Sequence, residues 1–172
     1  MNSVELFLHG AGRPVIIEAQ PGDVLHDVLA KHDALPRDGE FVYVGEVRHT
    51  KSDPDPKHED QAPADLALTL LDLDLPVKRH IHTRTPQVID VAVEFNGQSP
   101  HRVFRPHTTV ESVLVWAKHR LHVDPVAGAD LVLEMVPGGE VPRMDAFLSD
   151  LAHGCAELTF KLVKEVNPQG AV

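Results

Sequence analysis

Hydrophobic and polar residues alternate with a period of two in the opening segments of the chain. The alternation covers residues 4–8 and 15–19, with a glycine-containing segment between them. A period of two places every second side chain on the same face of a strand, so the two segments predict a β-hairpin. Asp23 is then expected to cap a helix, because apolar residues recur at helical spacing over 24–29.

Two further strands complete this first unit. Residues 41–46 are rich in valine and aromatic residues, which favour strands. The closing strand is predicted at 80–84, after a short apolar segment at 66–75.

The second half of the chain shows a similar pattern. Residues 89–95 alternate and end at Asn96-Gly97, a strong signal for a tight hairpin that leads into a strand at 103–104. Thr108 and Glu111 have the spacing of a capping box, and the apolar residues that follow share one helical face.

Strands at 131–135 and 158–162 complete this second unit. Each unit therefore has the order strand, strand, helix, strand, short turn, strand. A hairpin cannot bury its apolar face alone, so the single helix of each unit must pack across the sheet. This arrangement is a β-grasp, and the predicted fold class is α+β with two tandem β-grasp domains.

Three pairs of matching positions show that the chain repeats itself. They are all offset by 87 residues: Val4 with Val91, Gly10 with Gly97, and Ala30-Lys31-His32 with Ala117-Lys118-His119. A repeat of this kind divides the 172 residues into two small domains. We expect domain 1 at 1–85, domain 2 at 86–164 and a flexible C-terminal tail at 165–172.

Composition narrows the classes of partner and compartment. A net charge of −10 disfavours nucleic acid, whose recognition needs clustered Lys and Arg. No apolar run approaches the roughly 20 residues that span a bilayer. No signal peptide follows Met1, and the single Cys155 cannot form an intramolecular disulfide. We therefore expect a cytoplasmic protein that binds neither membrane nor nucleic acid.

Two segments connect the predicted elements in different ways. Residues 48–63 are rich in Pro, Asp and Lys, so we expect a solvated polar insertion within domain 1. The junction at 83–87 is short, which favours a semi-rigid pair of domains.

The chain resembles a tandem ubiquitin-like protein. The resemblance rests on the element order, the strand at 41–46 with Gly45, the segment 145–150 in the place of a short helical turn, and the closing strand at 158–163. It is similar in particular to the tandem ubiquitin-like modifiers of bacterial antiphage operons, which look like counterparts of the interferon-induced tandem modifier of vertebrates.

That resemblance implies attachment rather than catalysis. The implied partners are an activating enzyme that uses ATP, a conjugating enzyme, a JAMM-type metalloprotease and target proteins, which include phage components. The chain itself would be no enzyme and would hold no cofactor.

The C-terminal tail carries the residues that this chemistry needs. Pro168 disfavours helix, so an extended tail is expected. Gly170 lacks a Cβ and offers little obstruction in a narrow enzyme channel. Because Ala171 follows it, the resemblance implies cleavage between Gly170 and Ala171. Gln169 stands where the family usually has another glycine, and we expect it to contact partners.

Two other functions stay open at this stage. The chain could be a non-conjugated adaptor that holds partner proteins together, or a sulfur carrier, although Gln169 argues against the latter. In the ubiquitin-like interpretation, Val42, Val44 and Val132 on the third strands would form the partner-docking surface.

The histidines and the cysteine are interpreted without a metal or catalytic role. His80 and His82 share one side of a strand, but a solvated face explains them better than a metal site. Cys155 precedes an apolar strand, so a buried small residue is expected. The other histidines that we assign to the polar surface are His49, His58, His101, His107, His119, His122 and His153.

Overall fold

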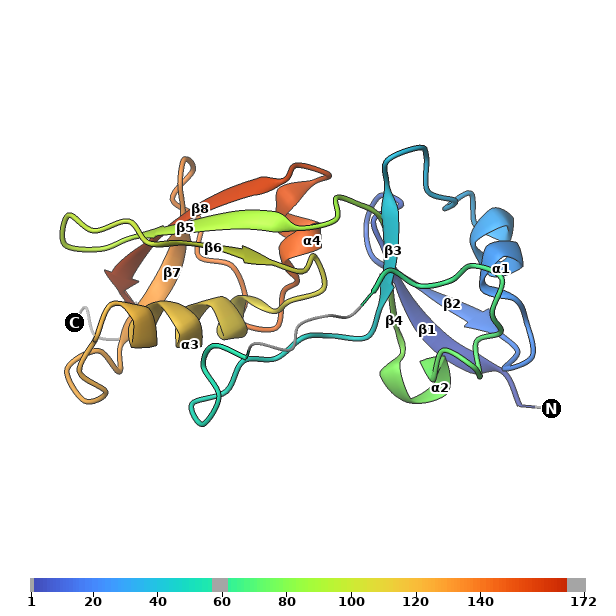
Figure 1. Ribbon diagram of the computed structural model, residues 1–172, viewed down its shortest axis with the longest axis horizontal. Coiled ribbons are helices and arrows are strands. Elements are labelled where there is room, and N and C mark those ends of the chain that lie inside the picture. The colour runs from blue at the N-terminus through green and yellow to red at the C-terminus, as the bar shows by residue number, and fades with distance from the viewer. Residues whose placement is uncertain (1, 57–61, 167–172) are drawn as a thin grey trace.

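The computed structural model describes residues 2–56 and 62–166. It contains two four-stranded sheets, one in each half of the chain (Figure 1). Each sheet is mixed, with one parallel pair between two antiparallel pairs. Within the described ranges, no helix has the length and apolar character needed to cross a membrane.

Domain 1 has the strand order β2-β1-β4-β3. Its elements are β1 (Val4–His9), β2 (Val15–Ala19), α1 (Leu25–Lys31), β3 (Phe41–Val44), α2 (Leu75–Lys78) and β4 (His80–Thr85). Strands β1 and β2 form the hairpin that the alternation predicts, and β1 runs parallel to β4. Helix α1 buries Leu25 and Leu29 against Leu6, Leu8 and Ile81 of the sheet.

Domain 2 repeats this topology with the order β6-β5-β8-β7. Its elements are β5 (Ile89–Glu94), β6 (His101–Phe104), α3 (Val110–Arg120), β7 (Leu131–Met135), α4 (Leu148–Ala152) and β8 (Glu157–Lys164). Trp116 of α3 is buried edge-on against Phe104 of β6, with the ring centroids 5.4 Å apart. The prediction of two β-grasp units is confirmed.

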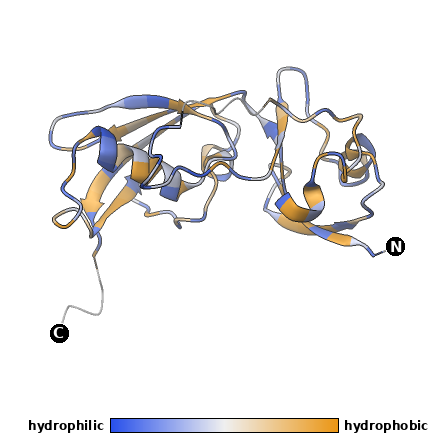
Figure 2. Ribbon diagram, turned by 60° about the horizontal axis from the view of Figure 1, so that its bottom comes forward, coloured by the Kyte–Doolittle hydropathy of each residue, from blue (hydrophilic) through white to orange (hydrophobic). Residues whose placement is uncertain are grey.

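Hydrophobic residues gather on the strands of both sheets, whereas the connecting segments are mostly hydrophilic (Figure 2). The apolar residues of the two halves form two separate clusters, one under α1 and one under α3. Each half of the repeat therefore builds its own core, as two small domains require.

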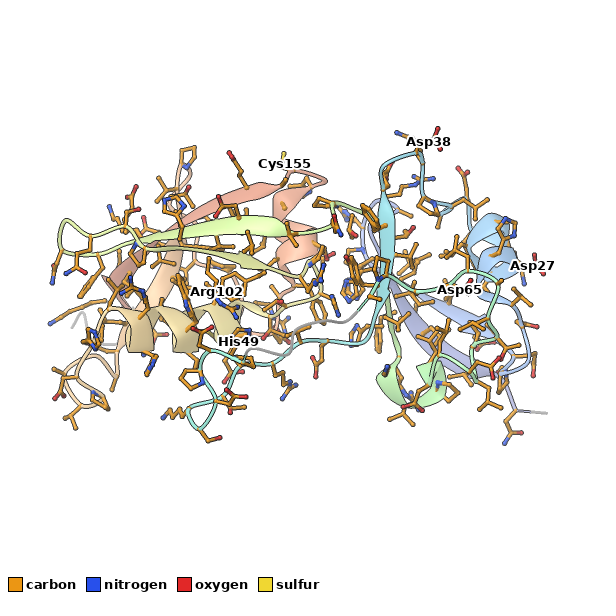
Figure 3. The ribbon with its side chains drawn as sticks, viewed as in Figure 1. Asp27, Asp38, His49, Asp65, Arg102 and Cys155 are labelled. Carbon is orange, nitrogen blue, oxygen red and sulfur yellow. The ribbon has the colours of Figure 1, made fainter. Side chains whose placement is uncertain are left out.

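Three local predictions are wrong. Asp23 does not cap α1: the helix begins after Val24, and the Asp23 carboxylate instead accepts the amide hydrogen of Gln20 at 2.8 Å. In α3 the cap is Thr109 rather than Thr108, and its side chain accepts from the amide of Ser112. Cys155 is exposed, because the turn before β8 keeps it outside the core (Figure 3).

Candidate functional site

The outer face of the domain 1 sheet, which points away from α1, carries aromatic and histidine side chains. Alternation in β1 sends Leu6 and Leu8 into the core and therefore Phe7 and His9 to the other side. We call this surface the histidine face; its members are Phe7, His9, Tyr43, His80 and His82. His82 is directly opposite His9 on the neighbouring parallel strand.

Domain 2 covers the histidine face. Phe147, which is 4% exposed, packs edge-on against the ring of His82 at a centroid distance of 4.5 Å. His107 stacks on Tyr43 at 4.8 Å. Tyr43 in turn donates a hydrogen bond to the carbonyl of Gln87 at 2.9 Å, which anchors the start of domain 2.

Polar contacts run across the same interface. His9 Nδ1 lies 2.9 Å from Asp150 Oδ2, and His82 Nδ1 lies 3.1 Å from Ser149 Oγ. Within domain 1, the other nitrogen of the same ring, His82 Nε2, is 3.0 Å from the carbonyl oxygen of Gly45. Asp150 and Ser149 both belong to α4, so this short helix of domain 2 contacts two adjacent strands of domain 1.

Burial changes the protonation of two of these histidines. The pKa of His82 is held well below its usual value, first by burial and then by the nearby His9 and His107 rings. The pKa of His80 is also lowered, by burial and then by His9. Both imidazoles therefore favour the neutral form near pH 7.

The interpretation of His80 and His82 as a solvated strand face is therefore wrong. Strand alternation correctly placed them on one side, but only the fold shows that domain 2 lies over that side. His49 and His107, which we assigned to the polar surface, are buried as well. The assignment of His58 lies outside the described residues.

The segment after β3 forms a second contact between the domains. We call residues 47–56 the strap. Val47 makes a parallel bridge to Thr108, and its amide donates to the carbonyl of His107 at 2.9 Å. The amide of His49 donates to Ser112 Oγ at 2.8 Å. The strap thus pairs with the residues just before α3 at Val47 and with the first turn of α3 at His49.

Arg102 of β6 holds the far end of the strap. Its guanidinium lies 2.9 Å from Asp55 Oδ1 and also donates to the carbonyl of Pro56, and it sits over the ring of Phe104. His49 and Arg102 are labelled in Figure 3, where the strap crosses from domain 1 to domain 2. Within the predicted polar insertion at 48–63, His49 and Pro56 are buried against domain 2, whereas Arg48, residues 50–53 and Asp55 are exposed.

The predicted docking valines are not an exposed patch. Val42 is 2% exposed and belongs to the domain 1 core, because alternation along β3 places it on the face opposite to that of Tyr43. Val132 lies on the outer face of the domain 2 sheet but is only 7% exposed. Val44 is half-buried. Residues Gln169, Gly170 and Ala171 lie outside the described residues.

The outer face of the domain 2 sheet is not covered by domain 1, in contrast to the histidine face, which domain 2 covers. Leu131 and Leu133 point into the core, so Glu134 and its cross-strand neighbour Lys161 lie on the outer face. Strand β8 runs parallel to β5, away from domain 1, so Lys164 lies at the far end of the molecule (Figure 1). The C-terminal segment therefore leaves domain 2 at the end that is remote from the interface.

Comparison with known proteins agrees with this architecture. Residues 90–165 match the family model of BilA ubiquitin-like domain 2. Domain 2 is thus similar to a ubiquitin-like domain over nearly its whole length. No curated protein matches the chain.

Two solved structures are also similar. One is the N-terminal ubiquitin-like domain of the 4931431F19Rik protein, at 18% identity and a TM-score of 0.37, covering 47% of this chain and 78% of that one. The other is the Arabidopsis thaliana protein At2g32350, at 15% identity and a TM-score of 0.37, covering 50% of this chain and 96% of that one.

His9 and the covering role of domain 2 were not predicted from the sequence. The sequence did hold a signal for His9: in an alternating strand, residue 9 lies on the same face as Phe7 and on the face opposite to that of Leu8. No comparable signal identified Phe147 or Asp150, which reach domain 1 only through the relative placement of two separately folded units.

Proposed function

We propose that this tandem ubiquitin-like protein is a non-enzymatic modifier that is attached to other proteins through the carboxylate of Gly170. The observation that carries the proposal is the family match of domain 2, the domain that bears the C-terminal segment. Its last strand delivers that segment at the end remote from domain 1. An activating enzyme can therefore approach the tail without meeting domain 1.

The chemistry proceeds in steps that partner enzymes perform. A protease of the JAMM type hydrolyses the bond between Gly170 and Ala171 and frees the Gly170 carboxylate. An activating enzyme joins this carboxylate to the AMP portion of ATP and releases pyrophosphate. A cysteine thiolate of a partner displaces AMP to give a thioester, and a target lysine amine then displaces the thiolate and forms the isopeptide bond.

The two domains take different parts in this scheme. Domain 1 uses its outer sheet face to bind domain 2, so that face is not open to partners. The outer face of domain 2, around Glu134 and Lys161, is open and lies on the domain that bears the tail. We assign the docking of the activating and conjugating enzymes to domain 2, together with Gln169 of the tail. The targets include phage components, which makes the role antiphage defence in the bacterial cytoplasm.

An adduct assay in cells that contain the partner enzymes tests the proposal. The tagged chain should appear on an immunoblot as a ladder of higher-mass species. Gly170→Phe should abolish the ladder, because a large side chain obstructs both cleavage and activation. The matched control is Gly22→Phe, since Gly22 has open space where a Cβ would stand and an ordinary backbone conformation.

Other outcomes would contradict the proposal. A ladder that persists in Gly170→Phe would show that Gly170 is not the point of attachment. An unprocessed chain that forms no adducts but still captures the partner enzymes would favour the adaptor. A processed chain whose intact mass shows a terminal thiocarboxylate would favour the sulfur carrier.

A further inference from the structure

Three histidines of the histidine face converge at the boundary between the domains. His80 and His82 lie two residues apart on β4, and His9 lies on the adjacent parallel strand β1. One ring nitrogen from each lies within 4.8 Å of those from the other two. We propose that His9, His80 and His82 bind a divalent transition metal, with Zn²⁺ as the best fit, and that the metal fastens domain 1 to domain 2.

The shortest separation in the cluster joins two ring nitrogens that share one hydrogen-bonding proton. His9 Nε2 lies 3.0 Å from His80 Nδ1. Two nitrogens on one tetrahedral Zn²⁺, with Zn–N bonds of about 2.0–2.1 Å, lie only slightly farther apart. The proton between these nitrogens must leave the shared position, and a neutral His80 can carry it on Nε2 instead. The third ring, that of His82, must move farther than the other two to reach a metal shared with them.

The outer contacts of the rings are those that orient metal ligands. Ligating histidines usually donate their other N–H to a carboxylate or a backbone carbonyl. His9 directs Nδ1 to the Asp150 carboxylate at 2.9 Å, and His82 directs Nε2 to the Gly45 carbonyl at 3.0 Å. These contacts leave His9 Nε2 and His82 Nδ1 as the nitrogens with lone pairs. Ser149 Oγ lies 3.1 Å from His82 Nδ1, so the metal would either displace this hydroxyl from the ring nitrogen or be coordinated by it.

The surroundings favour binding of a cation by neutral ligands. His82 is fully buried and His80 is half-buried, so a bound cation would be largely shielded from water. His80 remains half-exposed and provides the route of entry. Imidazole suits Zn²⁺, Cu²⁺ and Ni²⁺, and a three-histidine set with an open fourth position is typical of Zn²⁺.

Because Asp150 and Ser149 come from domain 2, the complete site exists only when the domains are docked. Metal binding must therefore stabilise the docked pair by mass action. This inference does not depend on conjugation, since β8, the last strand, ends at the opposite end of domain 2. Failure of the metal experiment would leave the adduct assay unaffected.

Calorimetric titration of Zn²⁺ into the full chain tests the proposal. The chain carries a tag without histidines and is first stripped with a chelator. We expect one equivalent to bind. Asp150→Asn should weaken binding by about 10–100-fold, the usual effect of losing an orienting carboxylate, and His80→Asn should weaken it more. The control is His26→Asn, an exposed histidine on α1, which should bind as the unaltered chain does.

A second readout needs no variant. Zn²⁺ should shift the side-chain nitrogen resonances of His9, His80 and His82 in long-range ¹H–¹⁵N spectra and leave those of His26 unchanged. Binding that is equally strong in His80→Asn, or shifts spread over the exposed histidines alone, would overturn the proposal. So would the absence of any stoichiometric binding by the folded, unaltered chain.

Discussion

His9 and Asp150 are 141 residues apart in the chain, yet His9 Nδ1 lies 2.9 Å from Asp150 Oδ2. The contact joins the end of β1 in domain 1 to α4 in domain 2. His9 is 6% exposed, so its ring has little access to water. This contact can therefore form only when the two domains are docked.

Removing the acceptor should loosen the docked pair. Asp150→Ala leaves a buried ring nitrogen without this partner, which costs about 1–3 kcal/mol, toward the lower end because the Asp150 side chain is partly exposed. Urea denaturation measures the loss. Asp145→Ala is the control, since that carboxylate only pairs with Arg143 in an exposed loop and should cost less than about 1 kcal/mol. Equal losses from the two variants would contradict the account.

Phe147 provides the apolar part of the interface. Phe147→Ala removes a buried ring that packs on His9, His80 and His82, and such truncations cost about 3–5 kcal/mol. Amide resonances of β4 should move toward those of domain 1 alone. Phe95→Ala, at the hairpin on the far side of domain 2, should destabilise domain 2 without moving β4 resonances. Unchanged β4 resonances in Phe147→Ala would show that the ring does not hold the domains together.

The strap depends on Arg102. Arg102→Ala removes the contacts to Asp55 and Pro56, so residues 50–56 should exchange amide hydrogens faster and be cut sooner by proteases. Arg143→Ala, which removes an exposed arginine elsewhere in domain 2, should leave this segment protected. Protection that is the same in both variants would mean that Arg102 does not anchor the strap.

The repeated glycines should respond differently to the same change. Gly10 has φ +101, and a Cβ there would collide with the carbonyl of Thr83. Gly97 has φ +78 with open space around it. Gly10→Ala should unfold domain 1, whereas Gly97→Ala should cost only about 1–2 kcal/mol of backbone strain. Circular dichroism melting compares the two, and equal melting temperatures would contradict the close packing of the end of β1 against β4.

The fold was predictable because each strand and helix carries its own periodicity. Alternation in residues 4–8 and 89–95 and the helical stripe in α3 identify their elements without reference to the rest of the chain. The helix caps were not predictable to the residue, since neighbouring threonines at 108 and 109 compete for the same role. Cys155 was misplaced because sequence proximity to an apolar strand does not decide the course of the turn before it.

The interface was beyond prediction because its parts follow no local pattern. In the sequence, the outward positions of a strand look the same whether solvent or another domain covers them. His9, His80 and His82 therefore have the pattern of a solvent-exposed strand face. The anchoring of the strap was not predictable either, because Arg102 and Ser112, which bind Asp55 and His49, lie in the other domain. Val42 illustrates the opposite error, because alternation along β3 places this predicted surface residue in the core.

Mass spectrometry of tryptic peptides from affinity-purified adducts tests the central claim most directly. Trypsin cuts after Lys164, so a conjugated target should yield a peptide whose lysine carries the remnant Glu165–Gly170 through an isopeptide bond. We predict this branched peptide, ending at Gly170 and lacking Ala171 and Val172. Recovery of only the linear C-terminal peptide that still ends at Val172, from cells in which the partner enzymes are active, would contradict the proposed function.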